Sequence, residues 1–167
     1  MRKGNDISTS RQRKLSRIIE TIEISASRDR VWEVISDVDN EPEYWWGTRE
    51  VRNFSKEDNV INREIFQNFG NRSILQKVVL TQQSEVEIQY LKGITEGVKH
   101  LRLDSLKGGN QELVAEWNIR FTGIYWLISP FIAKHVRKGT KDALVRIKEA
   151  SEGRPIVQRE KIAKGQR

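Results

Sequence analysis

The stretch "IEISASRDRVWEVISDVDNEPEYWWGTREV", residues 22–51, decides the fold because its hydrophobic pattern changes from one period to another. Residues 18–25 alternate between isoleucine and mostly polar side chains, which predicts a β-strand. Ser27 then offers a helix N-cap, and Val31 and Ile35 lie about one helical turn apart. The sequence therefore predicts a strand followed at once by a short helix.

Three consecutive aromatic residues, Tyr44, Trp45 and Trp46, end the acidic part of this stretch. Neighbouring side chains on a helix or strand point in different directions, so the three rings cannot all be buried on one regular element. They either fill the core at a tight bend or surround the mouth of a ligand cavity, with one tryptophan packed inward. Pro42 favours the first turn of a second short helix. We expect the nearby carboxylates to face solvent: Asp37, Asp39, Glu41 and Glu43.

From about residue 48 the pattern is that of strands separated by turns. The best of these strands is 112–121, in which every second residue from Leu113 to Phe121 is apolar, Trp117 included. This alternation is typical of an antiparallel strand with one buried face. The other predicted strands cover residues 48–55, 60–69, 73–83, 85–91 and 98–106.

A helix of roughly 20 residues is predicted to begin near Ser129, with Pro130 tolerated in its first turn. It is the only element long enough to cover the apolar face of the sheet. An apolar space is then expected between the sheet and this helix. The predicted apolar stripe of the helix consists of Ile128, Phe131, Ile132, His135, Val136, Gly139, Ala143 and Ile147.

Two segments, 22–51 and "TGIYWLISPFIAKHVRKGTKDALVRIKEASEG" at 122–153, carry a resemblance to a known superfamily. The chain resembles the START-like (SRPBCC) superfamily, especially its polyketide cyclase/dehydrase and coenzyme-Q-binding branches. The resemblance implies an α+β helix-grip fold, in which a curved antiparallel sheet of about seven strands surrounds a long C-terminal helix. Two short helices would follow the first strand. The superfamily includes lipid carriers, hormone receptors, aromatase/cyclases and quinone-binding proteins, so the resemblance favours a fold more than an activity.

The positive charge is concentrated at the two ends of the chain. Residues 1–17 hold six Lys or Arg and one Asp, and residues 152–167 hold five against two Glu, while the whole chain has a net charge of +7. The body, 18–151, is therefore slightly acidic, which disfavours a nucleic-acid groove within it. We predict one START-like ligand-binding domain at 18–151, flanked by basic tails at 1–17 and 152–167. The tails could contact an anionic membrane.

The leading functional hypothesis is the binding or carriage of a hydrophobic small molecule in the cavity between sheet and helix. A lipid, a quinone, an isoprenoid or an aromatic polyketide-like compound would suit such a site. The same residues would also form a solid core. The predicted ligand-binding residues are Tyr44, Trp45, Trp46, Trp117, Phe121, Ile128, Phe131, Ile132 and His135.

Two alternatives stay open, namely a polyketide cyclase/dehydrase-type enzyme and an interaction protein whose basic arms contact RNA or DNA. No residue motif predicts a catalytic group, a cofactor or a metal site, because the chain has no cysteine and only two histidines. Arg63, Tyr90 and Tyr125 are conceivable polar groups of the cavity. No secretory signal and no run of about 20 apolar residues is present, which favours a cytoplasmic protein, with a peripheral membrane contact through the tails.

Overall fold

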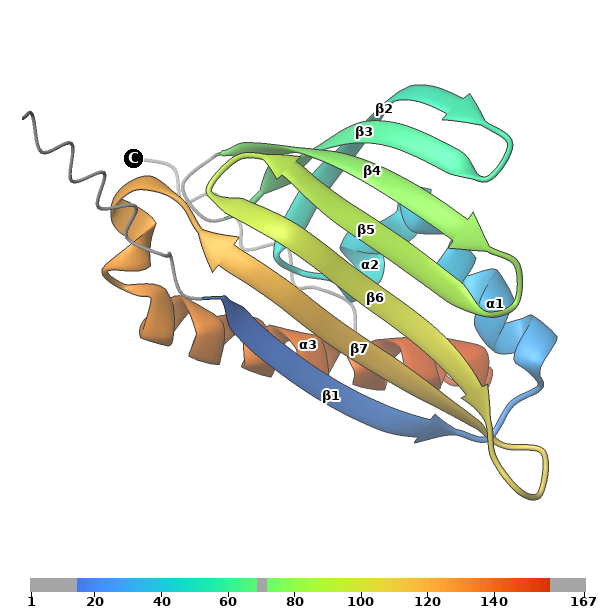
Figure 1. Cartoon of the computed structure of the whole chain (residues 1–167). Coiled ribbons are helices and arrows are strands. Elements are labelled where there is room, and N and C mark those ends of the chain that lie inside the picture. The colour runs from blue at the N-terminus through green and yellow to red at the C-terminus, as the bar shows by residue number, and fades with distance from the viewer. Residues whose placement is uncertain (1–14, 69–71, 157–167) are drawn as a thin grey trace, which may run out of the picture.

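A computed structural model describes residues 15–68 and 72–156 (Figure 1). The described part of the chain runs from β1 through three short helical segments and six further strands to a long helix. The elements are β1 (Ser16–Ile24), α1 (Arg28–Ser36), the 3-10 helix η1 (Val38–Asn40), α2 (Glu41–Tyr44), β2 (Thr48–Glu57), β3 (Val60–Gln67), β4 (Ser73–Thr81), β5 (Glu85–Lys92), β6 (Thr95–Ser105), β7 (Gln111–Phe121), the 3-10 helix η2 (Gly123–Trp126) and α3 (Ser129–Ser151).

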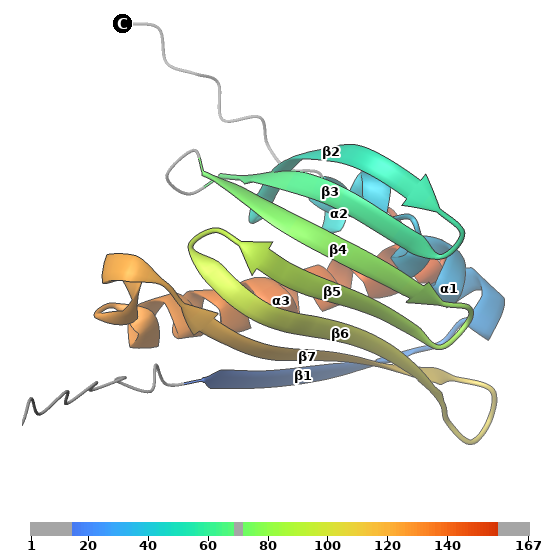
Figure 2. The same cartoon turned by 45° about the horizontal axis from the view of Figure 1, so that its top comes forward.

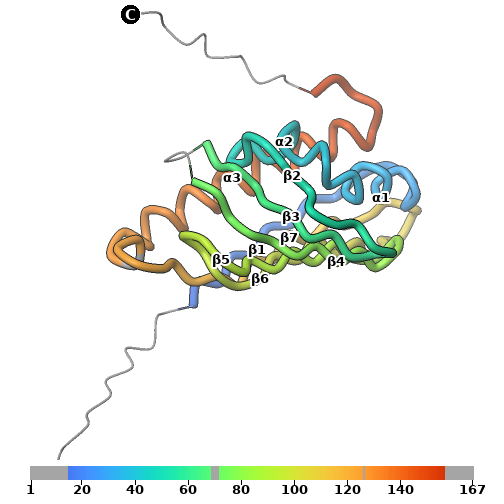
Figure 3. The backbone as a smooth tube through the Cα atoms, turned by 90° about the horizontal axis from the view of Figure 1, so that it is seen from above, coloured from blue at the N-terminus to red at the C-terminus, as the bar shows by residue number. Residues whose placement is uncertain are grey.

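The seven strands form one antiparallel sheet in the order β1-β7-β6-β5-β4-β3-β2. The sheet is curved, and α1, α2 and α3 all lie on the same face of it (Figures 2 and 3). The predicted α+β helix-grip architecture is therefore confirmed, including the two short helices that follow the first strand.

The local signals near the N-terminus explain α1. The Ser27 hydroxyl accepts a hydrogen bond from the Arg30 amide at 3.3 Å, which caps the helix as predicted. Val31, Val34 and Ile35 are buried and form one face of α1 against the sheet. In β7 the predicted inward face is also confirmed, since Leu113, Ala115, Ile119 and Phe121 are buried and Trp117 is half-buried.

The predicted apolar stripe of α3 is wrong in its first half. Phe131, His135 and Gly139 are exposed, whereas Ala143 and Ile147 are buried. The second half packs beside α1 and α2, but the first half lies at the end of the molecule opposite α1 (Figure 3). It therefore lacks the neighbouring helices that bury the second half. The helix does begin at Ser129, although Ile128 rather than Ser129 is its N-cap residue.

The two predicted basic tails lie mostly outside the described residues. Ser16 and Arg17 already belong to β1, so the first strand begins two residues earlier than predicted. At the other end, Glu152 is the C-cap of α3. Within the described residues, no helix combines the length and the apolar character that a membrane span requires.

Candidate functional site

Six side chains from α2 and five consecutive strands form a polar cluster inside the apolar core. The strand register explains it: Arg63 of β3 pairs with Gln76 of β4, Gln76 pairs with Tyr90 of β5, and Lys99 of β6 pairs with Trp117 of β7. Residues paired across neighbouring strands share one face of a sheet. We call this set the polar core cluster, and its members are Glu41, Arg63, Gln76, Tyr90, Lys99 and Trp117.

Arg63 is the best-satisfied member of the polar core cluster, although its side chain is fully buried. Its Nε donates to Gln76 Oε1 at 2.9 Å, and one terminal nitrogen donates to the Val38 carbonyl at 2.8 Å. The other terminal nitrogen donates to the Glu41 carboxylate. Arg63 thus fixes η1 and α2 against the sheet through two hydrogen bonds, while the third holds it to β4.

Glu41 is buried, which corrects the prediction that all four nearby carboxylates face solvent; Asp37, Asp39 and Glu43 are exposed as expected. The reason is the buried positive charge beneath α2. Burial pushes the pKa of Glu41 upward, but Arg63 and Lys99 outweigh this effect and hold the pKa below its ordinary value. Glu41 is therefore ionised at neutral pH.

Lys99 is only 1% exposed and lies between two indole rings. Its ammonium nitrogen is 3.4 Å from the centre of the Trp45 ring and 4.9 Å from that of Trp117, and the Glu41 carboxylate is 4.0 Å away. It makes no hydrogen bond to a described residue. Burial, helped by Arg63 and opposed by Glu41, lowers the pKa of Lys99 to about 8.

Two further donors in the polar core cluster have no hydrogen-bond partner among the described residues: Gln76 Nε2 and Trp117 Nε1. The orientation of the Gln76 amide is fixed, because Arg63 can only donate and must therefore face Oε1. Burial and the neighbouring Glu41 carboxylate raise the pKa of Tyr90, while Arg63 and the Gln76 side chain oppose the rise. With Lys99, three members of the cluster offer N–H groups that no described acceptor satisfies. The cluster is rich in donors and short of acceptors.

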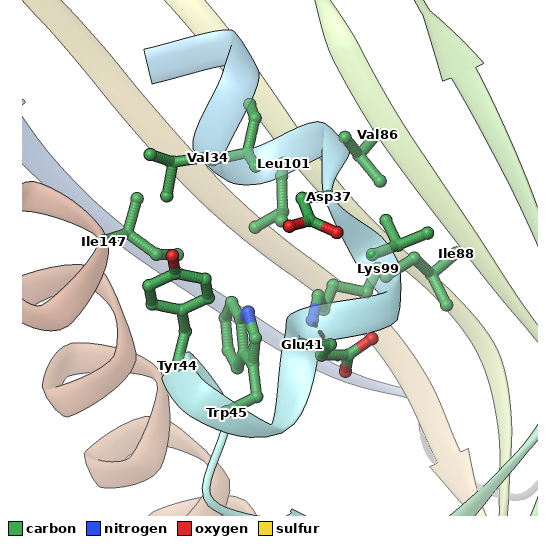
Figure 4. A pocket seen from close by; sticks show the side chains of 12 residues that line it. Val34, Asp37, Glu41, Tyr44, Trp45, Val86, Ile88, Lys99, Leu101 and Ile147 are labelled. Atoms are coloured by element: carbon green, nitrogen blue, oxygen red, sulfur yellow. Dashed lines mark ion pairs between the residues drawn. The ribbon is translucent and has the colours of Figure 1, made fainter. Parts of the chain in front are cut away.

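A small cavity adjoins the cluster beneath α1 and α2 (Figure 4). Its volume is about 20 Å³, which is room for about one water molecule and far below the roughly 300–1,000 Å³ of a small-molecule site. The side chains of Lys99 and Glu41 form part of its wall, next to the rings of Tyr44 and of Trp45, the C-cap residue of α2 (Figure 4). The lining residues are Val34, Ile35, Asp37, Val38, Glu41, Tyr44, Trp45, Val86, Ile88, Lys99, Leu101 and Ile147.

A larger groove of about 430 Å³ lies on the surface between the start of β1 and the first half of α3. It is open to solvent, and the charged residues that line it, Arg17, Lys134 and Arg137, are exposed. Water already hydrates exposed charges of this kind, so a small molecule in the groove would gain little binding free energy from them. We therefore place the candidate site at the polar core cluster.

The structure gathers three of the nine predicted ligand-binding residues at this site. Tyr44 and Trp45 line the cavity, and the Trp117 ring lies edge-on to Trp45, with 5.9 Å between ring centres. Trp45 is the tryptophan that packs inward. Trp46 is half-buried, with the Arg146 guanidinium 3.6 Å from its ring centre.

The other five predicted residues lie away from the cavity. Phe121 is buried near the end of β7, and Ile132 is half-buried on α3. Ile128, Phe131 and His135 are exposed. The histidine therefore does not face the cavity in this structure.

Sequence reasoning missed Glu41, Gln76 and Lys99 as site residues, while it named Arg63 and Tyr90 only as conceivable polar groups. One signal was present for Lys99, since it shares the inward parity of β6 with Leu101 and Leu103. A lysine in register with two buried leucines is a buried lysine. Among the described residues, no group of three or more His, Cys, Asp or Glu side chains could hold a metal ion.

Comparison with solved structures finds the same fold at low sequence identity. TTHA0849 from Thermus thermophilus superposes with a TM-score of 0.71 at 12% identity, covering 83% of this chain and 98% of that one. The Zhui aromatase/cyclase from Streptomyces sp. R1128 superposes with a TM-score of 0.66 at 16% identity, covering 83% of this chain and 94% of that one. The di-domain ARO/CYC StfQ of the steffimycin biosynthetic pathway superposes with a TM-score of 0.70 at 11% identity, covering 83% of this chain and 51% of that one.

A comparison with curated proteins found no significant match. The family model described as "Polyketide cyclase / dehydrase and lipid transport" matches residues 24–128, which extend from the end of β1 to the N-cap of α3. That segment contains every member of the polar core cluster and the predicted short helices. The chain therefore belongs to the polyketide cyclase/dehydrase and lipid transport family of START-like proteins.

Proposed function

We propose that the protein binds or carries a hydrophobic small molecule whose polar end has an acceptor oxygen, such as the carbonyl of a quinone or of an aromatic polyketide-like compound. The observation that carries this proposal is the surplus of donors in the polar core cluster. Gln76 and Trp117 each offer an N–H group without a described acceptor, and the Lys99 ammonium is 4.0 Å from the Glu41 carboxylate, beyond hydrogen-bonding distance. A buried polar group left unpaired costs about 1–3 kcal/mol, and a ligand oxygen that accepts from it would recover part of that.

The buried charges favour the same class of ligand. Arg63 and protonated Lys99 carry two positive charges against the single negative charge of Glu41, so the cluster has a net positive charge in an apolar surrounding. An enolate or phenolate oxygen beside Lys99 would balance the surplus positive charge, and a carbonyl oxygen would accept a hydrogen bond from the ammonium group. The Trp45 and Trp117 rings on either side of the ammonium provide apolar surface for the rest of an aromatic ligand.

Such a ligand needs more room than the 20 Å³ of the cavity, so in this proposal α2 and Trp45 move outward when it binds. The segment suits that role because α2 has only four residues and its N-cap Asn40 makes no side-chain hydrogen bond to the helix. Glu41, which connects α2 to Arg63 and Lys99, would respond to a ligand at the cluster. Binding and opening would therefore be coupled.

Catalysis of the cyclase/dehydrase type is the second candidate, favoured by an amine with a pKa of about 8 and a carboxylate that line one cavity. Loss of water from a β-hydroxy ketone needs a base for the α-proton and an acid for the departing hydroxyl. Protonated Lys99 could supply the acid. The lowered pKa of Glu41 makes it a weak base, which is why binding stands first. The basic arms of the RNA/DNA alternative lie mostly outside the described residues.

Equilibrium dialysis against 9-fluorenone and fluorene, which have the same ring frame with and without a carbonyl oxygen, tests the proposal. We expect the protein to retain the ketone at least tenfold more tightly, and Lys99→Met to remove that preference. Lys77→Met on the outward-facing side of β4 is the matched control and should keep it. Equal retention of both compounds by the unmodified protein would contradict the role of Lys99. Native mass spectrometry of the freshly purified protein would identify a ligand that it already carries.

A further inference from the structure

Four large apolar side chains protrude from one end of the molecule. Their exposed fractions are 72% for Ile124, 59% for Leu127, 45% for Ile128 and 80% for Phe131. Ile124 lies on η2, Leu127 and Ile128 connect η2 to α3, and Phe131 lies in the first turn of α3. Both elements are at the end of the fold opposite α1 (Figures 1 and 3). We call these four residues the apical patch. Contiguous apolar surface of this kind marks an interaction site more often than single exposed residues do.

Basic side chains continue the apical patch along α3. Lys134 and Lys138 follow Phe131 by three and seven residues, and this spacing places all three on one side of the helix. Both lysines are exposed, and neither forms an ion pair with a described residue. Across residues 123–141 there are four Lys or Arg and no Asp or Glu. The end of the molecule therefore combines protruding apolar groups with two lysines, Lys134 and Lys138, whose charge no described carboxylate compensates.

We propose that the apical patch docks the protein on an anionic lipid surface, with its apolar side chains in the boundary between headgroups and acyl chains and with Lys134 and Lys138 among the lipid phosphates. Segments that lie in the membrane interface combine a strongly basic polar face with large apolar residues in this way. This inference rests on the surface alone and does not depend on a ligand at the polar core cluster.

Charge complementarity decides between a membrane and a second copy of the chain. Two copies that met through their apical patches would bring the lysines of one copy near those of the other, and like charges oppose such a contact. An anionic membrane instead presents the opposite charge over a wide area. The patch also protrudes, so it can enter the soft headgroup layer without a matching groove.

The position of the patch also fits shallow docking. Its residues come from η2, the first turn of α3 and the two residues that connect them, and the buried half of α3 begins only at Thr140. Docking therefore requires no rearrangement of the core. Arg137 and Lys141, whose side chains lie 3.6 and 3.7 Å from the Glu20 carboxylate, connect this half of α3 to β1.

Co-sedimentation of the full chain with vesicles of 70% phosphatidylcholine and 30% phosphatidylglycerol tests the proposal, with pure phosphatidylcholine vesicles in parallel. We expect binding to the anionic vesicles that is at least tenfold tighter than to the neutral ones. The variant Leu127→Ser/Phe131→Ser should lose at least tenfold in that affinity, and Lys134→Gln/Lys138→Gln should lose several-fold and show a weaker dependence on salt. Both variants retain residues 1–14 and 157–167, so any contribution of the tails stays constant.

Matched controls change similar residues elsewhere on the surface. Phe54→Ser/Leu91→Ser removes two apolar side chains that are 60% and 54% exposed, and Lys56→Gln/Lys107→Gln removes two exposed charges. Both controls should bind as the unmodified protein does. Unchanged binding of the Leu127→Ser/Phe131→Ser variant would overturn the proposal and assign membrane contact to the tails. A dimer of the unmodified protein that this variant converts to a monomer, seen by light scattering, would also overturn it in favour of a second copy.

Discussion

The ammonium nitrogen of Lys99 lies 3.4 Å from the centre of the Trp45 ring, so a charge on the sheet is covered by an aromatic residue at the end of α2. The contact joins two elements that are far apart in the sequence. It also places the buried charge directly beneath the segment that would have to move for a ligand to enter. The stability of α2 and the ionisation of Lys99 are therefore coupled.

The pH dependence of stability should reveal the buried lysine. Because the pKa of Lys99 is about 8 in the folded protein and about 10.4 when unfolded, the unfolded state binds more protons between these values. The free energy of unfolding therefore increases as pH rises from about 8 to about 10.4, because the cost of burying a charged Lys99 is relieved, by on the order of 3 kcal/mol. We expect the free energy of unfolding of the unmodified protein, relative to Lys99→Met, to rise by this amount between about pH 7 and pH 10.5 in urea titrations. A constant difference would mean that Lys99 is not buried in solution.

Glu41→Gln should be strongly destabilising, because it leaves Arg63 and Lys99 as two buried positive charges without a counter-ion. Breaking a buried pair by removing one partner costs about 3–5 kcal/mol. Urea denaturation at pH 7 measures the loss, and Glu43→Gln on the exposed side of α2 should change stability by less than about 0.5 kcal/mol. The double variant Glu41→Gln/Lys99→Met should recover part of the loss. Equal effects of the two single glutamine variants would contradict the buried charge cluster.

Trp45→Ala should both destabilise the protein and enlarge the cavity. Trp45 is 9% exposed, and replacing a buried tryptophan with alanine costs about 3–5 kcal/mol. The enlarged space should take up a small aromatic molecule, so benzene should raise the melting temperature of the variant and not that of the unmodified protein. Trp46→Ala, at the half-buried neighbouring ring, is the matched comparison and should show no benzene effect. If both variants responded alike, the two rings would not differ in role.

Two glycines should respond to alanine with opposite signs. Gly97 has φ +129°, and a Cβ there would lie 2.2 Å from the Asn118 carbonyl oxygen, so Gly97→Ala should cost about 1–3 kcal/mol or more. Gly139 lies within α3 with nothing within 4 Å of such a Cβ, so Gly139→Ala should stabilise by about 0.5–1 kcal/mol. Thermal melts of the two variants check both signs. Stabilisation by Gly97→Ala would contradict the β6–β7 packing.

The fold was predictable because its signals are local. The Ser27 cap, the alternation in β7 and the proline in the first turn of α3 each act over a few residues, and each is confirmed. The exposed first half of α3 was not predictable in this way, because an apolar stripe indicates a face but not whether another element covers it.

The candidate site was less accessible to sequence reasoning, because its charges find one another only through the sheet. Glu41 lies in an acidic stretch that is otherwise exposed, and only Arg63 and Lys99, 22 and 58 residues later, make its burial favourable. Trp45 and Trp46 were indistinguishable as neighbours in the sequence. Their difference depends on the buried Lys99, because the ring of Trp45 covers its ammonium group.

The division of α3 at Gly139 has a mechanical consequence. The second half of the helix is anchored by the buried side chains Ala143, Leu144 and Ile147, while the first half is more exposed and is connected to β1 by the Arg137–Glu20 ion pair. Local opening of the first half exposes little apolar core, so backbone amides of residues 133–139 should exchange with deuterium much faster than those of 143–151. The anchored half includes Ile147, which lines the cavity, so the cavity wall belongs to the more stable part of the helix. Uniform protection along α3 would show that the helix opens as one unit instead.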